Sequence, residues 1–475
     1  MSNPEKSASK MWSGRFREPL DATFESWQRS FPFDARLLPQ EVAASKAHAQ
    51  VIAAAGILSN AELTAMLDGL AKVLAQNARP LAEIVSSAPE AEDIHHFVEL
   101  QLTKVIGDLA LKLHTGRSRN EQIATDMRLF VRDAIDATLR GLLEWNSALI
   151  ELAKSAGDAV MPSYTHLQRA EPVLVAHWLL AYVSMIERDM SRLADARKRM
   201  NLCPLGSGAI AGATLALDRT IAAEVLGFDG PTLNSMDATS DRDFAIEFTQ
   251  ALATVGLHIS RFAEELTLHS TAEFGFLDLP ERFSTGSSAM PQKKNPDLTE
   301  LIRGKSGRLL GDATALATLV KGLPLAYNKD LQEGQEPVFD AADTMAGMLS
   351  VLPAFTRALQ FRFDRMKTAS ETGYLNAMAA ATYLTHKGVP FRKGHEYVGN
   401  AVRLGLESGR ELQHLTLEEL REICPEFGED FFDAITLEAT LDCHDVIGGT
   451  ARQRVKDALA DAERRIGVES GKLPS

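Results

Sequence analysis

Residues 244–266 read FAIEFTQALATVGLHISRFAEEL, and the apolar positions of this stretch decide the fold. Large apolar side chains recur in it every three or four residues. These positions are Phe244, Phe248, Leu252, Val255, Ile259, Phe262 and Leu266. The spacing places them all on one face of an α-helix, which predicts a long helix that buries this face in a core.

The segments on either side of this stretch predict further long helices. No glycine or proline lies between Pro172 and Pro204, and residues 118–161 contain only Gly141 and Gly157. Runs of alternating β-branched residues, which are the usual signal of strands, are weak throughout the sequence. Long helices of this kind pack side by side as a bundle. The predicted fold class is therefore all-α, with apolar surface left over for burial against other subunits.

The composition is that of an ordinary globular protein. Of 475 residues, 45% are hydrophobic and 24% are charged, which excludes a disordered chain. The net charge of −14 disfavours binding to nucleic acid. No run approaches the roughly 18 apolar residues of a membrane span. The first ten residues, MSNPEKSASK, lack the apolar centre of a secretion signal. We therefore expect a cytoplasmic protein that does not bind membranes.

Cysteine usage argues against a disulfide framework or a zinc site. The only cysteines are Cys203, Cys424 and Cys443, and no pair of them has the spacing of metal ligands. We expect reduced, mostly buried thiols. No cluster of ligand residues stands out in the sequence, so we predict neither a metal nor an organic cofactor.

Residues 284–297, STGSSAMPQKKNPD, form the first of three segments that do not resemble core. Small polar residues between long helices predict a mobile loop. Asn295 suits a helix N-cap and Pro296 the first helical position. The positive end of that helix, with Lys293 and Lys294, suits an anion. A plain surface loop explains the same composition.

Two other segments place polar side chains before long helices. Residues 113–120, LHTGRSRN, offer Arg117 and Arg119, whose guanidinium forks match carboxylates. Residues 163–169, SYTHLQR, offer His166, and histidine is the usual general acid or base near neutral pH. A capped helix with solvated charges and a structural histidine are the alternatives.

The three segments together carry a resemblance. Residues 286–296, GSSAMPQKKNP, resemble the signature loop of the fumarase/aspartase superfamily, and the QKKNP variant is similar to its argininosuccinate lyase branch. Other stretches similar to this branch follow one another in the same order along the chain. They are MWSGRF at 11–16, EDIH at 92–95, TGRSRN at 115–120, YTHLQRA at 164–170, PLGSG at 204–208, DRDF at 241–244 and LPLAYNKDLQE at 323–333.

The resemblance implies a function and an architecture. The reaction would be the reversible elimination of argininosuccinate to L-arginine and fumarate, in arginine biosynthesis. The subunit would have three helical domains, and four subunits would form a homotetramer around a central bundle, with each active site shared among three chains. We expect the domains at residues 1–117, 118–367 and 368–475, the middle one carrying the bundle and the catalytic loop.

Four residues match the family's catalytic positions. The resemblance implies that Ser287 is the base that takes the carbon proton and that Lys293 faces the resulting carbanion. His166 is the family's candidate for the second proton transfer, and Glu300 matches the carboxylate that orients this histidine. The group that protonates the departing guanidine stays open.

Binding roles carry over to a further set of positions. By family matching they are Ser30, Asn120, Thr165, Asn295, Tyr327 and Gln332. Arg119 is a carboxylate clamp on chemical grounds. Gln335 stands where the family commonly has a lysine that contacts substrate, and Glu121 and Glu171 replace the usual Asp and Gln.

Two alternatives remain at this point. The neutral Gln335 leaves room for a sister enzyme that acts on another succinyl-amine. A structural protein, as the lens δ-crystallins are, would keep the fold without the activity, although Ser287, His166, Lys293 and Glu300 are all present.

Overall fold

The computed structural model describes residues 18–471 and is mostly helical, as the sequence predicts. The family-like stretch at 11–16 lies outside the described residues. Contacts divide the chain into two compact units built from separated segments. Unit 1 comprises residues up to Phe130, Asn201–Asp241 and Gly322–Glu336. Unit 2 comprises Val131–Met200, Arg242–Lys321 and the residues from Pro337 onward. The three predicted domain ranges stay a prediction.

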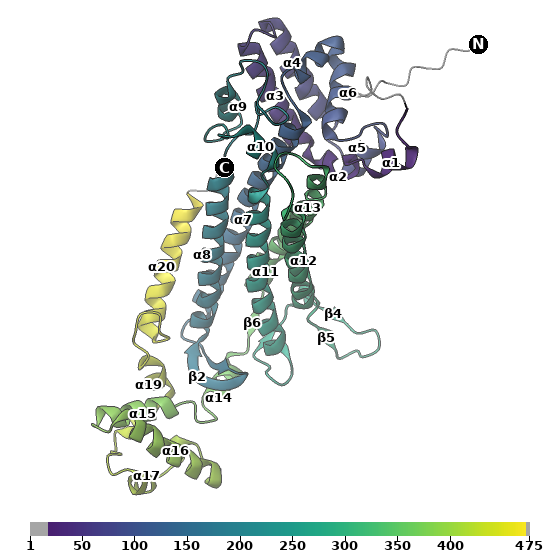
Figure 1. Ribbon diagram of the computed structural model, residues 1–475. Helices are drawn as coiled ribbons and strands as arrows, with labels where there is room; N and C mark the ends of the chain where they lie inside the picture. Colours follow the sequence, from purple (N-terminus) through teal and green to yellow (C-terminus); the bar gives the residue numbers. More distant parts are fainter. Residues whose placement is uncertain (1–17, 472–475) are drawn as a thin grey trace, which may run out of the picture. The chain divides into compact units, whose positions relative to one another are not determined.

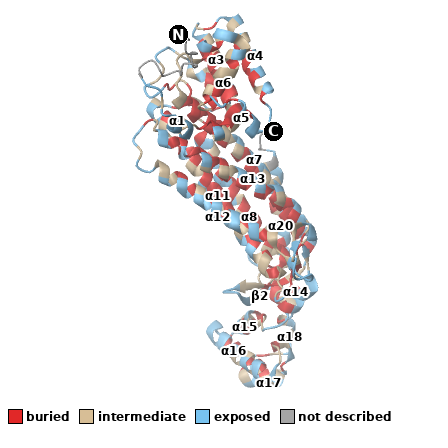
Figure 2. Ribbon diagram, turned by 90° about the vertical axis from the view of Figure 1, so that its right-hand side faces the viewer, coloured by how far each residue is buried: buried red, intermediate tan, exposed pale blue. Residues whose placement is uncertain are grey.

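Unit 2 contains the bundle of long helices (Figure 1). Its members are the later part of α7 (Arg119–Ala156), α8 (Val175–Met200), α11 (Asp243–Ser270), α12 (Asp297–Val320) and most of α13 (Gln335–Arg357). The predicted apolar face of α11 is confirmed, because all seven of its side chains are at most 2% exposed. This helix packs against both α12 and α8. Figure 2 shows the buried positions gathered where the bundle helices face one another.

Aromatic side chains fill the centre of the bundle. The ring of Trp145 on α7 lies edge-on to that of Phe262 on α11, with centroids 5.6 Å apart. Its indole N–H donates to Oγ1 of Thr356 on α13 at 3.1 Å. A buried tryptophan needs such a partner, so this bond fixes how α7 and α13 lie against α11.

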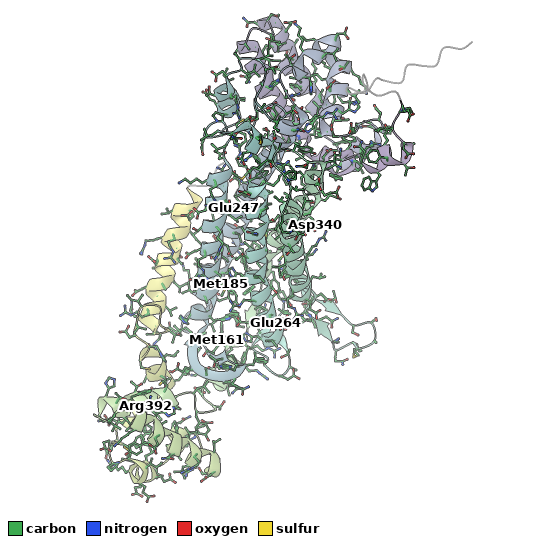
Figure 3. All side chains as sticks on the ribbon, in the orientation of Figure 1. Met161, Met185, Glu247, Glu264, Asp340 and Arg392 are labelled. Carbon is green, nitrogen blue, oxygen red and sulfur yellow. The ribbon has the colours of Figure 1, made fainter. Side chains whose placement is uncertain are left out.

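Ion pairs also connect neighbouring helices of the bundle, and Figure 3 labels the acidic partners Glu247, Glu264 and Asp340. Glu247 on α11 pairs with Arg199 on α8 at 2.8 Å. Glu264 on α11 and Asp340 on α13 pair with Arg303 and Arg308 of α12, respectively. Exposed pairs of this kind add little stability, so the apolar interior holds the bundle together.

A β-hairpin that the sequence did not predict precedes α8. Strand β1 (Val160–Thr165) pairs antiparallel with β2 (Gln168–Leu174), and the ladder ends at the pair Thr165 and Gln168. The two residues between them, His166 and Leu167, form the turn. Two further pairs of short strands are β3 (Leu277–Asp278) with β6 (Gln360–Phe361), and β4 (Thr285–Gly286) with β5 (Lys294–Asn295).

Residues 374–435 of unit 2 form short helices around a small core of their own, which includes Leu384, Phe427 and Phe431. These helices are α15 (Ala377–His386), α16 (Phe391–Ser408), α17 (Leu417–Ile423) and α18 (Phe431–Ala434). A capping box begins α17, because Thr416 and Glu419 each accept from the other's backbone N–H. The other helices of this part of the chain are α14 (Phe363–Ser370), α19 (Leu437–Asp442) and α20 (Arg452–Ser470), and α20 packs against α8.

Unit 1 is a cluster of shorter helices in which α3 packs against α4, α6 and α9. The long loop before α9 folds around one side chain: Arg219 donates to carbonyl oxygens of Cys203, Leu205 and Thr232. The elements are α1 (Ala22–Trp27), α2 (Phe31–Asp34), α3 (Leu38–Ala54), α4 (Asn60–Gln76), α5 (Leu81–Ser86), α6 (Ile94–Ile106), the start of α7, α9 (Arg219–Val225) and α10 (Ser235–Ser240).

One segment, Lys329–Arg357, is long and apolar enough to cross a membrane by length and composition. Its most apolar window has a mean hydropathy of 1.2, and 61% of that window is buried inside the structure. Burial of this kind is typical of a core helix of a water-soluble protein.

The α11–α12 seam makes a stability prediction. A Cβ atom at Gly256 of α11 would lie 2.8 Å from Cδ1 of Leu309, which is fully buried on α12. Gly256→Ala should therefore destabilise the protein by about 1–3 kcal/mol, despite the better helix propensity of alanine. Thermal unfolding measures this. The control is Gly399→Ala on α16, where the new methyl group meets nothing within 4 Å. That change should be neutral or stabilising, and an equal loss in both variants would contradict the packing argument.

Candidate active site

A polar cavity of about 220 Å³ lies within unit 1 and collects many of the predicted binding residues. The wall is built from α2, the start of α6, the start of α7 and the segment that leads into α13. The lining residues are Ser30, Asp34, Glu92, Asp93, His95, Arg119, Asn120, Ile123, Tyr327, Lys329, Gln332 and Gln335. Six of these were predicted as binding residues: Ser30, Arg119, Asn120, Tyr327, Gln332 and Gln335.

Local hydrogen bonds hold the predicted binding side chains in place. Ser30 is buried at the N-terminus of α2, and Asn120 donates to the carbonyl of Ala209 at 3.3 Å. Gln332 donates to the carbonyl of Gln28 at 3.1 Å. Gln335 is 4% exposed, and its Oε1 has no hydrogen-bond partner among the described residues. A buried acceptor of this kind is available to a ligand.

Arg119 is engaged by neighbouring carboxylates. Its Nη1 lies 2.9 Å from Oδ2 of Asp93 and 3.3 Å from Oε2 of Glu92. The Asp93 carboxylate also accepts the backbone N–H of His96 and so caps α6. Arg119 thus fastens the start of α7 to the start of α6, while its predicted role as a carboxylate clamp stays a prediction.

Glu121 acquires a physical role in the structure. Its carboxylate accepts the backbone N–H of Ser118 at 3.0 Å and that of Gly208 at 2.8 Å. It therefore ties the loop before α7 to the PLGSG stretch at 204–208. The longer reach of glutamate, where the family commonly has aspartate, serves both bonds.

Asp34 is the least solvated acid on the cavity wall. Burial and the nearby charge of Asp93 raise its pKa to about 7. One of its oxygens, Oδ1, has no hydrogen-bond partner among the described residues. Near neutral pH this side chain is therefore divided between the acid and the carboxylate.

The predicted base lies in unit 2, in a loop whose ends are joined by the β4–β5 pair and which extends from the bundle (Figure 1). The Oγ of Ser287 accepts the backbone N–H groups of Ala289 at 3.2 Å and Met290 at 3.1 Å. Donors aimed at the oxygen favour its negative form. The role of Ser287 as the base stays a prediction, and these two donors are what the loop would contribute to it.

The helix after this loop begins one residue later than predicted. The first helical residue of α12 is Asp297, and Pro296 is its N-cap without a side-chain hydrogen bond. Asn295 is the last residue of β5 instead of the cap. The Asp297 carboxylate accepts from both the N–H and the hydroxyl of Thr285, so it closes the base of the loop. Lys293 is exposed within the loop.

His166 occupies the turn of the β1–β2 hairpin, next to the predicted binding residue Thr165. Both His166 and Leu167 have positive φ angles, 56° and 57°. This region is unusual for residues other than glycine, and for leucine it is strained. Two successive positive φ angles suit a tight hairpin turn, which exposes the imidazole at its tip.

Glu300 lies on the first turn of α12, where its closest ionic partner is Arg303, with the charged atoms 3.8 Å apart. Within the described residues of one chain, no hydrogen bond or ion pair joins His166 to Glu300. Their predicted pairing therefore stays a prediction. The structure brings together the binding residues of unit 1, and it brings Ser287, Lys293 and Asn295 together in one loop.

Six cavity residues were missed as site residues. They are Asp34, Glu92, Asp93, His95, Ile123 and Lys329. Four of them belong to the stretches EDIH and LPLAYNKDLQE, whose resemblance to the family was noted without a role for these side chains. Asp34 and Ile123 carried no sequence signal of their own.

Known proteins match the chain along nearly its whole length. A family model described as lyase matches residues 14–311, and one described as argininosuccinate lyase C-terminal matches residues 374–442. Argininosuccinate lyase of Acidobacterium capsulatum is 64% identical over 461 residues, which cover 96% of this chain and 95% of that protein. The chain belongs to the argininosuccinate lyase family. The family predicted from the motifs, and the prediction of a lyase, are thereby confirmed.

Further relatives and solved structures agree. Argininosuccinate lyase of Koribacter versatilis is 57% identical over 457 residues, covering 96% of this chain and 97% of that protein. A variant of EDDS lyase with bound fumarate superposes with a TM-score of 0.81 at 25% identity, covering 94% of this chain and 91% of that one. Fumarate lyase from Mesorhizobium shares the fold, with a TM-score of 0.71 at 20% identity, covering 94% of this chain and 100% of that one.

The raised pKa of Asp34 makes a pH prediction. In the unfolded chain Asp34 loses its proton near pH 4, whereas the folded protein keeps this proton up to about pH 7. Between these two pH values the folded state therefore becomes less stable as pH rises. Asp34→Asn removes the titration. The melting temperature of the variant minus that of the wild type should therefore be larger at about pH 8 than at about pH 5. Asp108→Asn, which changes an exposed carboxylate of unit 1, is the control. A difference that does not vary with pH would contradict the assignment.

Proposed function

We propose that this chain splits argininosuccinate reversibly into L-arginine and fumarate, with Ser287 as the base and with active sites shared among the subunits of a homotetramer. The observation that carries the proposal is the 64% identity to an argininosuccinate lyase along 96% of the chain. The cavity in unit 1 adds to it, because six of the predicted binding residues line one polar wall. The family favours a cytoplasmic location and a role in arginine biosynthesis.

The unit 1 cavity binds the substrate through short-range polar contacts. Ser30, Asn120, Tyr327 and Gln332 provide hydroxyl and amide groups, which suit the carboxylate and ammonium groups of an amino acid. Gln335 adds an amide in place of the family's usual lysine. An amide can donate and accept, but it carries no charge. Affinity in this chain therefore relies on hydrogen bonds at that position.

The first chemical step removes a proton from the carbon next to a carboxylate of the succinyl group. Ser287 accepts this proton, and the two N–H groups on its Oγ stabilise the charged form of the oxygen. The electron pair left on carbon spreads into the neighbouring carboxylate, which then carries two negative charges. Lys293 in the same loop supplies the positive charge that this group requires.

The second step breaks the C–N bond and forms fumarate. A proton must reach the departing guanidine nitrogen, because an anionic guanidine is a poor leaving group. His166 carries out this second proton transfer, with Glu300 orienting its imidazole. Two further residues complete the binding groups. Thr165 lies next to the turn that contains His166, and Asn295 lies in the strand pair that closes the catalytic loop.

Exposed apolar surface on the bundle favours a homotetramer. Leu257 on α11 and Leu301 and Leu310 on α12 are 45%, 60% and 42% exposed. Leu257 and Leu310 also line a groove of about 520 Å³ that α11 and α12 form together. Apolar side chains arranged along two neighbouring helices are typical of an interface between subunits. The expected mass in solution is four times the 51.8 kDa of one chain.

The direct test of the function follows fumarate by its ultraviolet absorbance after purified protein is mixed with argininosuccinate. Release of fumarate supports the proposal. Folded tetramer that releases none, but acts on adenylosuccinate, aspartate or malate, would identify a sister enzyme. Inactivity towards all four substrates would indicate a structural protein.

The loop geometry predicts that Ser287→Ala lowers kcat by at least ~10²-fold, the low end for a lost acid–base group. The protein should stay folded, because the side chain lies in a loop and bonds only to backbone N–H groups of that loop. Ser288→Ala changes the adjacent, exposed serine and serves as the matched control. Near-normal turnover by the Ser287 variant would refute its role as base.

Shared sites predict complementation between two inactive variants. If Ser287 and His166 of one site come from different chains, mixed tetramers of Ser287→Ala and His166→Asn subunits contain some sites with both residues intact. Random assembly from equal amounts should restore about a quarter of the sites. The measurement is fumarate release after the two variants are dissociated together and reassembled. No recovery from verified mixed tetramers would place both residues of a site on one chain.

A further inference from the structure

A group of buried charged side chains lies beside the unit 1 cavity. Glu41 of α3 is 1% exposed, and its carboxylate accepts the hydroxyl of Ser45 at 2.6 Å. Its other oxygen lies 2.7 Å from Nδ1 of His95 on α6. The amide of Gln122 on α7 donates to the same carboxylate at 3.2 and 3.3 Å. Glu41 is thus held by three helices and cannot easily turn away from the imidazole.

Two positively charged side chains, His95 and Arg117, face the carboxylate of Glu41. Arg117, whose Nη1 lies 3.9 Å from Oε1 of Glu41, supplies one positive charge. Burial alone would raise the pKa of Glu41, but the charges of His95 and Arg117 hold it below its usual value. Burial and the charge of Glu41 raise the pKa of Asp126, which lies 3.7 Å from the same imidazole nitrogen. Near neutral pH, Glu41 is therefore charged and Asp126 neutral.

His95 connects this buried group to the cavity, because it is one of the lining residues. Since its Nδ1 is taken by Glu41, Nε2 is the ring nitrogen left for the cavity. Among the described residues, none forms a hydrogen bond with this Nε2, since the bonds of the ring are all made by Nδ1. Burial alone would lower the pKa of His95, but Glu41, Asp93 and Asp34 together raise it. An imidazolium carries a proton on both nitrogens, so Nε2–H can donate.

We propose that Glu41 is a positioning residue that holds His95 with Nε2–H directed into the unit 1 cavity, where it donates to a carboxylate of the substrate. The inference rests on the proposed function, because it takes argininosuccinate, which carries three carboxylates, as the ligand of this cavity. The imidazolium is a fixed donor: its orientation is set by a buried carboxylate before any substrate arrives. Such preorganisation lowers the cost of binding.

The same side chains have the spacing of a metal site, since ligand atoms of Glu41, His95 and Asp126 lie within 4.8 Å of one another. Arg117 argues against a metal, because its guanidinium already supplies the positive charge at Glu41. The short bond from Nδ1 to Glu41 likewise uses the nitrogen that a metal would need. A stoichiometric divalent ion in the purified protein would overturn the proposal.

The test measures binding without turnover, in the Ser287→Ala background, by titration calorimetry with argininosuccinate. Glu41→Gln keeps the shape of the side chain and removes its charge, and it should weaken binding on the order of 10-fold. The matched control is Asp126→Asn, which replaces a neutral acid of the same cluster with a neutral amide that can also donate to Glu41. It should leave the affinity within about 2-fold. Equal losses in both variants would show that the cluster is merely structural.

The pH dependence of the affinity distinguishes donation by a charged His95 from a purely structural role of this side chain. Affinity should fall as pH rises through the pKa of His95, because Nε2 then loses its proton, and in Glu41→Gln the fall should move to lower pH. The charged groups that face His95 or its partners are Asp34 on α2, Glu41 on α3, Asp93 at the start of α6, His114 and Arg117 before α7, and Asp126 on α7. The pKa of Asp34 is also raised, so the comparison is repeated with Asp34→Asn.

The outcomes distinguish the inference from the function on which it rests. If the Ser287→Ala protein binds no argininosuccinate, the proposed function fails. If it binds equally well with and without Glu41→Gln, the function stands and the inference is wrong. Should Glu41→Gln fail to fold, the pH dependence measured in the Asp34→Asn protein decides, and an affinity independent of pH would overturn the proposal.

Discussion

The burial of one face of α11 is the constraint on which unit 2 depends. Seven large apolar side chains along this helix are excluded from water, and α12 and α8 pack against it over most of its length. Because the segment that carries Ser287 leaves the end of α11 and returns at the start of α12, both of its anchors belong to this seam. The loop can move only between fixed ends. The Asp297–Thr285 bonds shorten that span further, so Ser287 is carried on a small closed loop.

Unit 1 depends on a different constraint, because it contains several charged side chains that are buried. Removing one partner from a buried ion pair costs far more than the pair contributes. The structure reduces this cost by placing His95 and Arg117 beside the carboxylate of Glu41 and by raising the pKa of Asp126. His95, which lines the cavity, is therefore held in place, because turning away would separate it from the carboxylate of Glu41.

The sequence revealed local patterns and missed what depends on distant partners. The apolar stripe of α11 could be predicted, because its residues are neighbours along one helix. The β1–β2 hairpin could not be predicted in this way. Its turn has positive φ angles at His166 and Leu167, where the usual sequence signal would be glycine or asparagine. Asp34 likewise gave no signal, because its raised pKa arises from burial by segments far away in the sequence. The catalytic residues came from family resemblance, which carries information that periodicity cannot.

The electrostatics of the two units also explain how an acidic protein can take an anionic substrate. The net charge of −14 repels carboxylates at long range, but salt screens this field beyond about 8 Å. At short range, Arg119 and Lys329 compensate Glu92 and Asp93 on the cavity wall, and Asp34 is partly protonated near neutral pH. The wall is thereby close to neutral before the substrate enters. In the mechanism that we propose, positive charge comes from Lys293, on the loop that carries the proposed base. A charge held there would favour the transition state over the bound substrate, as catalysis requires.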